Sequence, residues 1–106
     1  MTGKQKTGGG DRTPIAVSIV EDDDWLRDNL AALLDSCSDF RCLSRFATAE
    51  AALVALPAQC PDVVLMDIGL PQMSGIECVR RLKAIVPSVQ VLMLTVYGDT
   101  ERVFAA

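Results

Sequence analysis

The sequence predicts an α/β protein with a doubly wound parallel sheet, in which helices cover both faces of the sheet. Four short runs with the character of strands alternate with segments whose apolar residues recur at helical spacing. The first run, IAVSIV, is β-branched and apolar at nearly every position, which is typical of a strand buried on both faces of a parallel sheet. Because strands and helices alternate, right-handed βαβ connections are expected.

The first strand is predicted at residues 15–20 (IAVSIV), directly before a run of four acidic residues. Asp23 or Asp24 can cap the helix that follows, which is expected over residues 25–35. We interpret Trp25, at the start of this helix, as partly buried in the core. The apolar stripe of the helix is formed by Leu26, Leu30, Leu33 and Leu34.

The second strand is predicted at residues 41–46 (RCLSRF). Thr48 then caps a short helix over residues 49–56, and Pro57 is expected to end that helix, because proline breaks the helical hydrogen-bond pattern. The third strand is predicted at residues 62–66 (DVVLM). These elements extend the alternating pattern of strands and helices.

Ser74 caps the next predicted helix, which ends at Pro87. The fourth strand runs over the residues VQVLML, from Val89 to Leu94. Asp99 or Thr100 opens a last helix. The core face of the helix capped by Ser74 is predicted to consist of Ile76, Val79, Leu82 and Val86.

Length and charge restrict the function further. The 106 residues allow one domain, which we place at residues 14–106 after a disordered Gly- and Lys-containing tail at residues 1–13. The net charge of −4 argues against nucleic acid or an anionic membrane as the partner of this segment. No apolar run is long enough for a membrane helix. The absence of histidine excludes His-based catalysis and His-containing metal sites.

The cysteines indicate a cytoplasmic protein. No two of the four cysteines form a CxxC pair, so metal-finger spacing is absent. We expect four reduced thiols, mostly buried. The N-terminal residues lack the apolar region of a secretory signal. The cysteines are Cys37, Cys42, Cys60 and Cys78.

Three acidic residues follow predicted strands. Glu21 and Asp22 come after the first strand, Asp67 after the third, and Thr95 after the fourth. The carboxyl ends of parallel strands meet at one edge of the sheet, so these carboxylates are expected to converge, with the hydroxyl of Thr95 at the rim. Clustered carboxylates repel one another unless a cation is present, and such oxygen ligands suit Mg²⁺ first and Mn²⁺ or Ca²⁺ next.

A simpler interpretation is that the acidic run only caps the helix and complements its dipole. Capping accounts for Asp23 and Asp24. It does not account for Glu21 and Asp22, which precede the cap, or for Asp67, which directly ends an apolar strand.

At these positions the chain resembles the receiver domain of bacterial two-component response regulators. The segments that carry the resemblance are IVEDD, DVVLMDIGLPQMSG and VLMLTV, and the match runs from residue 15 to residue 106. The resemblance implies a flavodoxin-like fold with strand order 2-1-3-4. The fifth strand and fifth helix of the family are missing here, so we expect a piece of a longer protein.

The resemblance implies a role for each site residue. Asp67 is the phosphoacceptor, and its phosphodonor is a histidine kinase or a phosphotransfer protein. Asp22 and Asp67 bind Mg²⁺ directly, Glu21 binds it through water, and Gly69 offers its backbone carbonyl; Mn²⁺ is also suitable. Thr95 hydrogen-bonds the phosphoryl group. The protein is then a signalling domain rather than an enzyme.

The resemblance fails at the lysine that ends the fifth strand in the family. Lys83 is not placed to replace it, and the strand Val89–Leu94 is left as an open sheet edge through which the chain could self-associate. Val96 resembles the subfamily with helix-turn-helix output, which implies transcription regulation. DNA would then be bound only through an output domain that this chain lacks.

Three other functions are compared with the motifs of the sequence. An aspartate-nucleophile phosphatase needs a second acid two residues after the nucleophile, where this chain has Gly69. A flavodoxin-type cofactor binder needs a phosphate-binding loop after the first strand, where this chain has four acids. A receiver-like scaffold that is not phosphorylated stays open, because the lysine is missing although the acidic set is intact.

Overall fold

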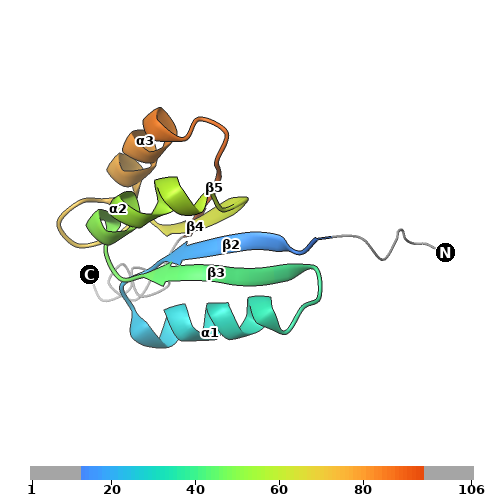
Figure 1. Ribbon diagram of the computed structural model, residues 1–106. Coiled ribbons are helices and arrows are strands. Elements are labelled where there is room, and N and C mark those ends of the chain that lie inside the picture. The colour runs from blue at the N-terminus through green and yellow to red at the C-terminus, as the bar shows by residue number, and fades with distance from the viewer. Residues whose placement is uncertain (1–12, 95–106) are drawn as a thin grey trace.

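The core of the fold is a parallel sheet. A computed structural model describes residues 13–94 of the chain (Figure 1). Within these residues, four parallel strands are ordered β3-β2-β4-β5, which confirms the predicted order 2-1-3-4. The strands are β2, Ile15–Val20; β3, Phe40–Phe46; β4, Val63–Asp67; and β5, Gln90–Leu94.

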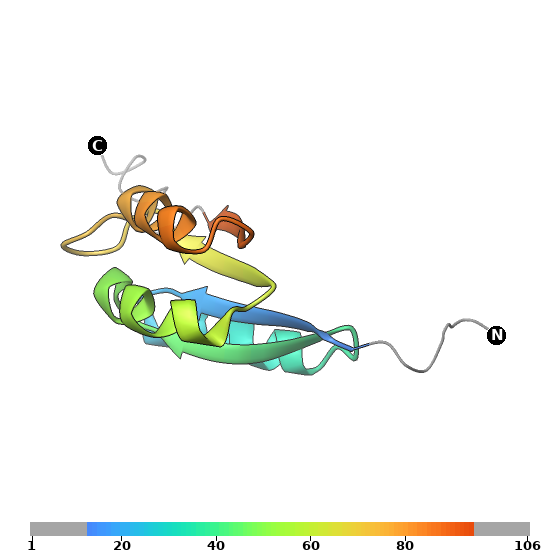
Figure 2. The ribbon, with the colours of Figure 1, turned by 45° about the horizontal axis from the view of Figure 1, so that its top comes forward.

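Helices cover both faces of the sheet. α1 packs on one face against β2 and β3, and α2 and α3 lie together on the other face (Figures 1 and 2). The predicted doubly wound α/β fold is therefore confirmed. No helix within residues 13–94 is long and apolar enough to cross a membrane. The helices are α1, Asp24–Asp35; α2, Ala49–Gln59; and α3, Gly75–Ile85.

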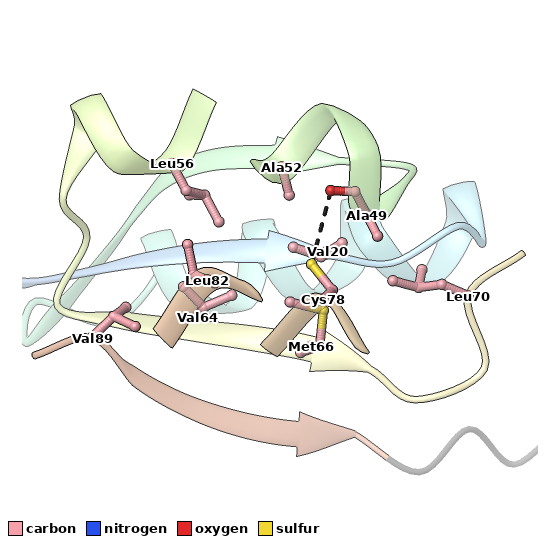
Figure 3. Packing of buried hydrophobic residues seen from close by; sticks show 10 residues of the cluster. All are labelled: Val20, Ala49, Ala52, Leu56, Val64, Met66, Leu70, Cys78, Leu82 and Val89. Carbon is pink, nitrogen blue, oxygen red and sulfur yellow. Dashed lines mark hydrogen bonds between the residues drawn. The ribbon is translucent and has the colours of Figure 1, made fainter. Parts of the chain in front are cut away.

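The main hydrophobic core lies between the sheet and the pair α2 and α3 (Figure 3). The two central strands contribute most of its sheet side, because alternate residues of β2 and β4 point to this face. The core fixes β2 beside β4, whose carboxyl ends carry the acidic residues. Its buried members are Val20, Ala49, Ala52, Leu56, Val64, Met66, Leu70, Cys78, Leu82 and Val89.

A β-bulge interrupts the pairing of β2 with β3. Val17 pairs with Cys42, but the next residue, Ser18, pairs with Ser44, so Leu43 is an extra residue in β3. The buried Ser18 hydroxyl lies 2.7 Å from the Ser44 hydroxyl, and the two form a hydrogen bond between the strands. The bulge therefore occurs in a strand at one edge of the described sheet.

Side chains cap all three described helices at the predicted places. Asp23, Thr48 and Ser74 each accept a hydrogen bond from the backbone N–H three residues further on, at distances of 2.9, 3.1 and 3.2 Å. Of the two candidates for the first cap, Asp23 has this role, and Asp24 is the first residue of α1.

The predicted end of α2 is wrong. The helix continues through Pro57 to Gln59 and is closed by Cys60 in the left-handed conformation, with φ of 50°. Pro57 has no N–H to donate to the Leu53 carbonyl, so α2 loses one helical hydrogen bond, and the buried Leu56 beside it holds the last turn against the core.

The predicted core face of α3 is partly wrong. Ile76 is 64% exposed, whereas Cys78 and Leu82 are fully buried. The reason is the close approach of Gly75 to the backbone carbonyl of Asp67. This contact turns Gly75, Cys78 and Leu82 toward the sheet and leaves Ile76 outside.

Trp25 is exposed, contrary to the expectation of partial burial. Its exposed fraction is 72%, while the buried residue of α1 is Ala31. Six residues separate the two, so they lie about 120° apart around the helix axis. The predicted leucine stripe is only half-buried, and Leu33 is largely exposed.

The expectation that the cysteines are mostly buried is also wrong. Cys78 is buried and Cys42 is half-buried, but Cys37 and Cys60 are exposed, since they lie in the turns after α1 and α2. The tail residues 1–12 and the helix expected to open at Asp99 or Thr100 lie outside the described residues.

Candidate functional site

Three carboxyl groups meet at the carboxyl ends of β2 and β4. Val20 pairs with Met66 in these neighbouring strands, so the residues that follow, Glu21 and Asp67, are brought side by side. One carboxylate oxygen from each of Glu21, Asp22 and Asp67 lies within 4.8 Å of the others. The predicted convergence of these residues is thus what the structure shows.

Burial differs sharply among the three. Glu21 is fully buried and Asp67 is 2% exposed, whereas Asp22 is exposed at the mouth of the cluster. The cluster therefore has two carboxyl groups in a low-dielectric interior and one facing solvent. A cation would reach it from the side of Asp22.

Backbone hydrogen bonds hold Glu21 in place. Its N–H donates to the Phe46 carbonyl at 3.0 Å, and its Oε2 accepts from the Asp23 N–H at 3.0 Å. Its Oε1 is buried and has no hydrogen-bond partner among the described residues. A buried oxygen without a donor is costly unless a ligand satisfies it.

Asp67 is held by the loop that follows it. Its Oδ1 accepts a hydrogen bond of 3.0 Å from the Gly69 N–H. The next residue, Ile68, donates its N–H to the Leu94 carbonyl of β5 and accepts from the Gly75 N–H. A Cβ atom on Gly75 would lie only 2.0 Å from the Asp67 carbonyl oxygen, so glycine is required there.

The electrostatics of the cluster favour a cation. Burial raises the pKa of Glu21 from 4.5 to about 7, and the charges of Asp67 and Asp22 add to the rise, while the hydrogen bond from Asp23 opposes it. Burial also raises the pKa of Asp67, and Asp22 contributes. The two buried carboxyl groups are thus poorly stabilised as anions by the protein alone.

The donor set fits a hard divalent ion. All three ligand groups are carboxylates, and the unpartnered Glu21 Oε1 gives the cluster an oxygen that the described residues leave unsatisfied. Oxygen ligands of this kind suit Mg²⁺, Mn²⁺ or Ca²⁺ rather than softer metals. The structure therefore supports a site that could bind a metal.

The other predicted site residues are placed less completely. Gly69 is exposed beside the cluster, with its N–H directed to Asp67. Thr95 lies outside the described residues. Lys83 donates to the carbonyls of Pro87 and Val89, at 3.3 and 2.7 Å. Lys83 thus binds the turn before β5, which agrees with the expectation that it does not serve the acidic cluster.

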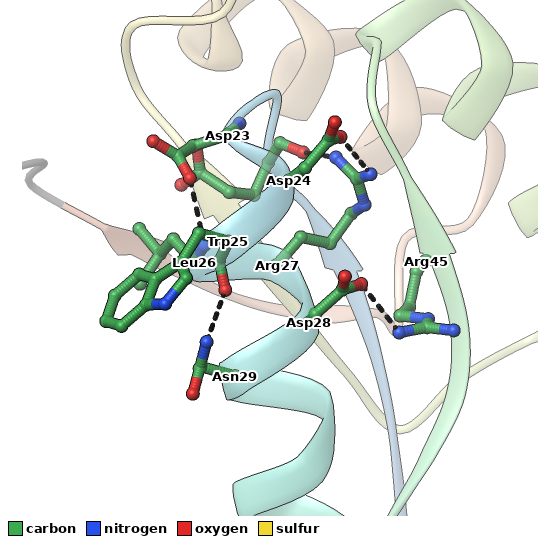
Figure 4. A network of polar contacts seen from close by, with 9 residues as sticks. Asp23, Asp24, Trp25, Leu26, Arg27, Asp28, Asn29 and Arg45 are labelled. Atoms are coloured by element: carbon green, nitrogen blue, oxygen red, sulfur yellow. Dashed lines mark hydrogen bonds and ion pairs between the residues drawn. The ribbon is translucent and has the colours of Figure 1, made fainter.

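Arg27 lies beside the cluster and was not predicted from the sequence. The guanidinium of Arg27 donates to the Glu21 carbonyl oxygen at 2.8 Å and also pairs with Asp24 (Figure 4). The available signal was the spacing of Asp24 and Arg27, three residues apart at the start of a helix. That spacing predicts an ion pair but not the bond to Glu21.

Comparison with known proteins agrees with this geometry. Residues 17–106 match the family described as response regulator receiver domain. The chain is 33% identical over 92 residues to the transcriptional regulatory protein LnrK of Bacillus subtilis, covering 87% of this chain and 42% of LnrK. It is 29% identical to the response regulator protein VraR of Staphylococcus aureus, covering 87% of the chain and 44% of VraR. The chain therefore spans less than half the length of these relatives.

Solved structures show the same fold. The response regulator domain of Thermotoga maritima CheB superposes with a TM-score of 0.74 at 26% identity, over 78% of this chain and 61% of that one. A two-component response regulator of the LuxR family from Aurantimonas gives a TM-score of 0.74 at 24% identity, over 78% and 59%. At that lower identity, the second comparison bears on the fold alone.

Proposed function

The chain belongs to the response regulator receiver domain family, and from this premise we propose that it accepts a phosphoryl group on Asp67 in a phosphorelay. The observation that carries the proposal is the position of Asp67: a buried carboxylate at the end of the central strand β4, clustered with Glu21 and Asp22. Such a carboxylate is a competent nucleophile once the phosphoryl charge is neutralised.

The proposed reaction is a transfer from phosphohistidine. A carboxylate oxygen of Asp67 forms the new P–O bond, the P–N bond to the donor imidazole breaks, and the imidazole leaves with a proton from solvent. The Gly69 N–H fixes the orientation of the carboxylate at 3.0 Å. The product is a mixed anhydride, which water hydrolyses. The chain would act as a self-catalysed signalling domain rather than as an enzyme with separate substrates.

We assign Mg²⁺ to the acidic cluster, with Mn²⁺ as a substitute. Asp22 and Asp67 would bind it directly, Glu21 through water, and Gly69 through its carbonyl. When bound, Mg²⁺ neutralises the charge of the phosphoryl oxygens. Thr95 would donate its hydroxyl to the phosphoryl group. The support is the convergence of three carboxylates and the buried, unpartnered Oε1 of Glu21.

We propose a histidine kinase or a phosphotransfer protein as the partner, and we place the chain itself in the cytoplasm. One relative is named a transcriptional regulatory protein, and one solved structure is described as LuxR family. We therefore propose that the full protein regulates transcription, with DNA bound by a domain outside this chain. Self-association through the strand edge at Val89–Leu94 is a separate prediction.

Phosphorylation can be tested directly. The chain is incubated with acetyl phosphate and Mg²⁺, and intact-protein mass spectrometry measures the gain of one phosphoryl group. We expect modification of the wild type, loss of the modification with EDTA, and no modification of Asp67→Asn. Asp28→Asn is the matched control, because Asp28 is an exposed carboxylate on α1 paired with Arg45. An unmodified wild type would favour the scaffold that is not phosphorylated.

A further inference from the structure

We propose that Arg27 is a positioning residue for the acidic cluster. Its guanidinium fixes the peptide group that joins Glu21 to Asp22, so that the affinity of the cluster for Mg²⁺ depends on Arg27. This inference rests on the proposed function, because it concerns the same metal site. Arg27 acts on the backbone of Glu21 and, within the described residues, forms no ion pair with the three carboxylates of the cluster.

The contacts of Arg27 are specific to this loop. Although Arg27 is charged, its side chain is only 16% exposed. One nitrogen, Nη1, donates to the Glu21 carbonyl oxygen at 2.8 Å, and the other, Nη2, pairs with the exposed carboxylate of Asp24 (Figure 4). The planar guanidinium can make both contacts at once, which an ammonium group cannot do with the same geometry.

Arg27 completes the hydrogen bonding of the Glu21 backbone. The Glu21 N–H is bound to Phe46, the Glu21 Oε2 to the Asp23 N–H, and the Asp23 carboxylate to the N–H of Leu26. The Glu21 carbonyl is the remaining polar group of that residue's backbone, and Arg27 satisfies it.

The carbonyl held by Arg27 belongs to the same peptide group as the Asp22 N–H. A peptide group is planar, so a hydrogen bond that holds its oxygen also fixes its N–H and the position of the Asp22 Cα. Asp22 is the exposed member of the cluster, and burial does not hold its side chain. Its carboxylate therefore depends on the backbone for its position, and Mg²⁺ requires near-ideal ligand geometry.

Charge and position predict opposite effects of removing Arg27. If only charge mattered, loss of a cation near three carboxylates would make the site more negative and strengthen Mg²⁺ binding. If position matters, the loss frees the Glu21 carbonyl and weakens Mg²⁺ binding. The sign of the change thus separates the two explanations without reference to overall stability.

The experiment is a calorimetric titration of the chain with MgCl₂. The variants are Arg27→Ala and Arg27→Lys, and Arg45→Ala is the matched control, because Arg45 forms an ion pair with Asp28 of the same helix, away from the Glu21 carbonyl. Mutation of a residue that supports a metal ligand usually lowers the affinity for the metal by about 10- to 100-fold. We expect a loss in this range for R27A, a smaller loss for R27K, and a change below about twofold for R45A.

Urea unfolding of each variant shows that the titrated protein is folded. If R27A does not fold, R27K carries the test, because it keeps the charge but lacks the second donor. Binding by R27K and R27A as tight as in the wild type, or tighter, would overturn the inference while leaving the proposed function intact. A wild type that binds no Mg²⁺ would instead overturn both.

Discussion

Glu21 is a carboxyl group whose ionisation should be visible in the stability of the protein. Its pKa is raised from 4.5 to about 7 in the fold, chiefly by burial. The raised pKa favours the protonated folded state, so this contribution is fully present below pH 4.5 and is lost as the pH rises through about 7. Without a divalent cation, the loss amounts to about 3 kcal/mol at pH 8.

Glu21→Gln tests this contribution. The variant keeps the shape of the side chain but cannot ionise. The quantity to measure is the free energy of unfolding of the variant minus that of the wild type, in EDTA. This difference should be larger at pH 8 than at pH 5, by up to about 3 kcal/mol. Urea unfolding at the two pH values measures the difference. A difference between variant and wild type that does not change with pH would contradict the assignment.

The four thiols should differ in reactivity. Cys78 is fully buried, and its pKa is raised to about 11 by burial, with the charge of Glu50 adding to the rise. Cys37 and Cys60 are exposed. With iodoacetamide at pH 8, we expect the exposed pair to be alkylated in the native state and Cys78 only after unfolding, as measured by peptide mass spectrometry. Rapid native labelling of Cys78 would show that α3 opens locally.

At this scale, the sequence predicted the residues whose place depends on strand ends alone. Glu21, Asp22 and Asp67 were identified because parallel strands deliver their last residues to one edge. Arg27 was missed because its role requires a side chain to fold back six positions along the chain. Trp25 was predicted wrongly, because its burial depends on how α1 is rotated on the sheet, which a local pattern does not determine.

Among the elements, α3 is joined to the acidic site through the close contact of Gly75 with Asp67. A Cβ on Gly75 would lie 2.0 Å from the Asp67 carbonyl oxygen, so either the helix or the strand end must move in Gly75→Ala. Forced contacts of this kind destabilise by roughly 1–3 kcal/mol. The control Ile76→Ala removes a largely exposed side chain in the same turn and should change stability by about 0.5 kcal/mol or less.

Urea unfolding of the two variants, together with the Mg²⁺ titration, separates the effects. We expect G75A to lose both stability and Mg²⁺ affinity, because Asp67 ends the strand against which α3 is placed. Equal stability of G75A and the wild type would mean that the close approach relaxes without cost.

The end of α2 provides another test at this scale. Cys60 adopts φ of 50° and ψ of 60°, a conformation that costs an L-residue roughly 1 kcal/mol but not glycine. Cys60→Gly should therefore be at least as stable as the wild type, and Cys60→Val less stable, because β-branching disfavours this conformation further. Thermal unfolding of the two variants gives the comparison, and a Val variant more stable than the Gly variant would exclude this explanation.

The type of each element was predictable, whereas the end of α2 and the buried face of α3 were not. The N-caps at Thr48 and Ser74 were predicted because a hydroxyl at the start of a helix accepts a hydrogen bond from a backbone N–H of the first turn. Pro57 misled the prediction because proline is tolerated in a last turn that tertiary packing holds. The face of α3 was missed because it depends on Gly75, whose close neighbour Asp67 is eight residues away.

For the molecule as a whole, the arrangement of the sheet was the most predictable feature. The parallel sheet follows from the alternation of strands and helices, whereas the strand order was predicted from the resemblance to receiver domains. Half-buried and exposed apolar side chains on α1 and β5 were less predictable, since exposure depends on which neighbours cover each face. Leu92 of β5 is 60% exposed, and Met93 is also exposed.

These exposed side chains lead to a prediction of self-association. β5 lies at one edge of the described sheet, and its apolar residues favour contact with another chain. We expect the mass from light scattering to rise with protein concentration, and Leu92→Lys to reduce that rise. Lys is a common protective residue on strand edges. The control Val54→Lys places the same charge on the exposed face of α2. An unchanged monomer mass at millimolar concentration would rule the association out.

Because of the bulge at Leu43, the two edge strands of the described sheet, β3 and β5, differ in how well they can pair with a further strand. β3 presents an irregular backbone register, whereas β5 pairs regularly with β4 along its whole length. Within the described residues, a partner strand therefore finds a more regular edge at β5 than at β3. In a symmetric dimer formed through β5, the β5 edge of each copy is already paired with the other copy. Only the irregular β3 edge of each copy is then left at the outside. The consequence is a limit on size: we expect association through β5 to stop at a pair and not to propagate into a fibre.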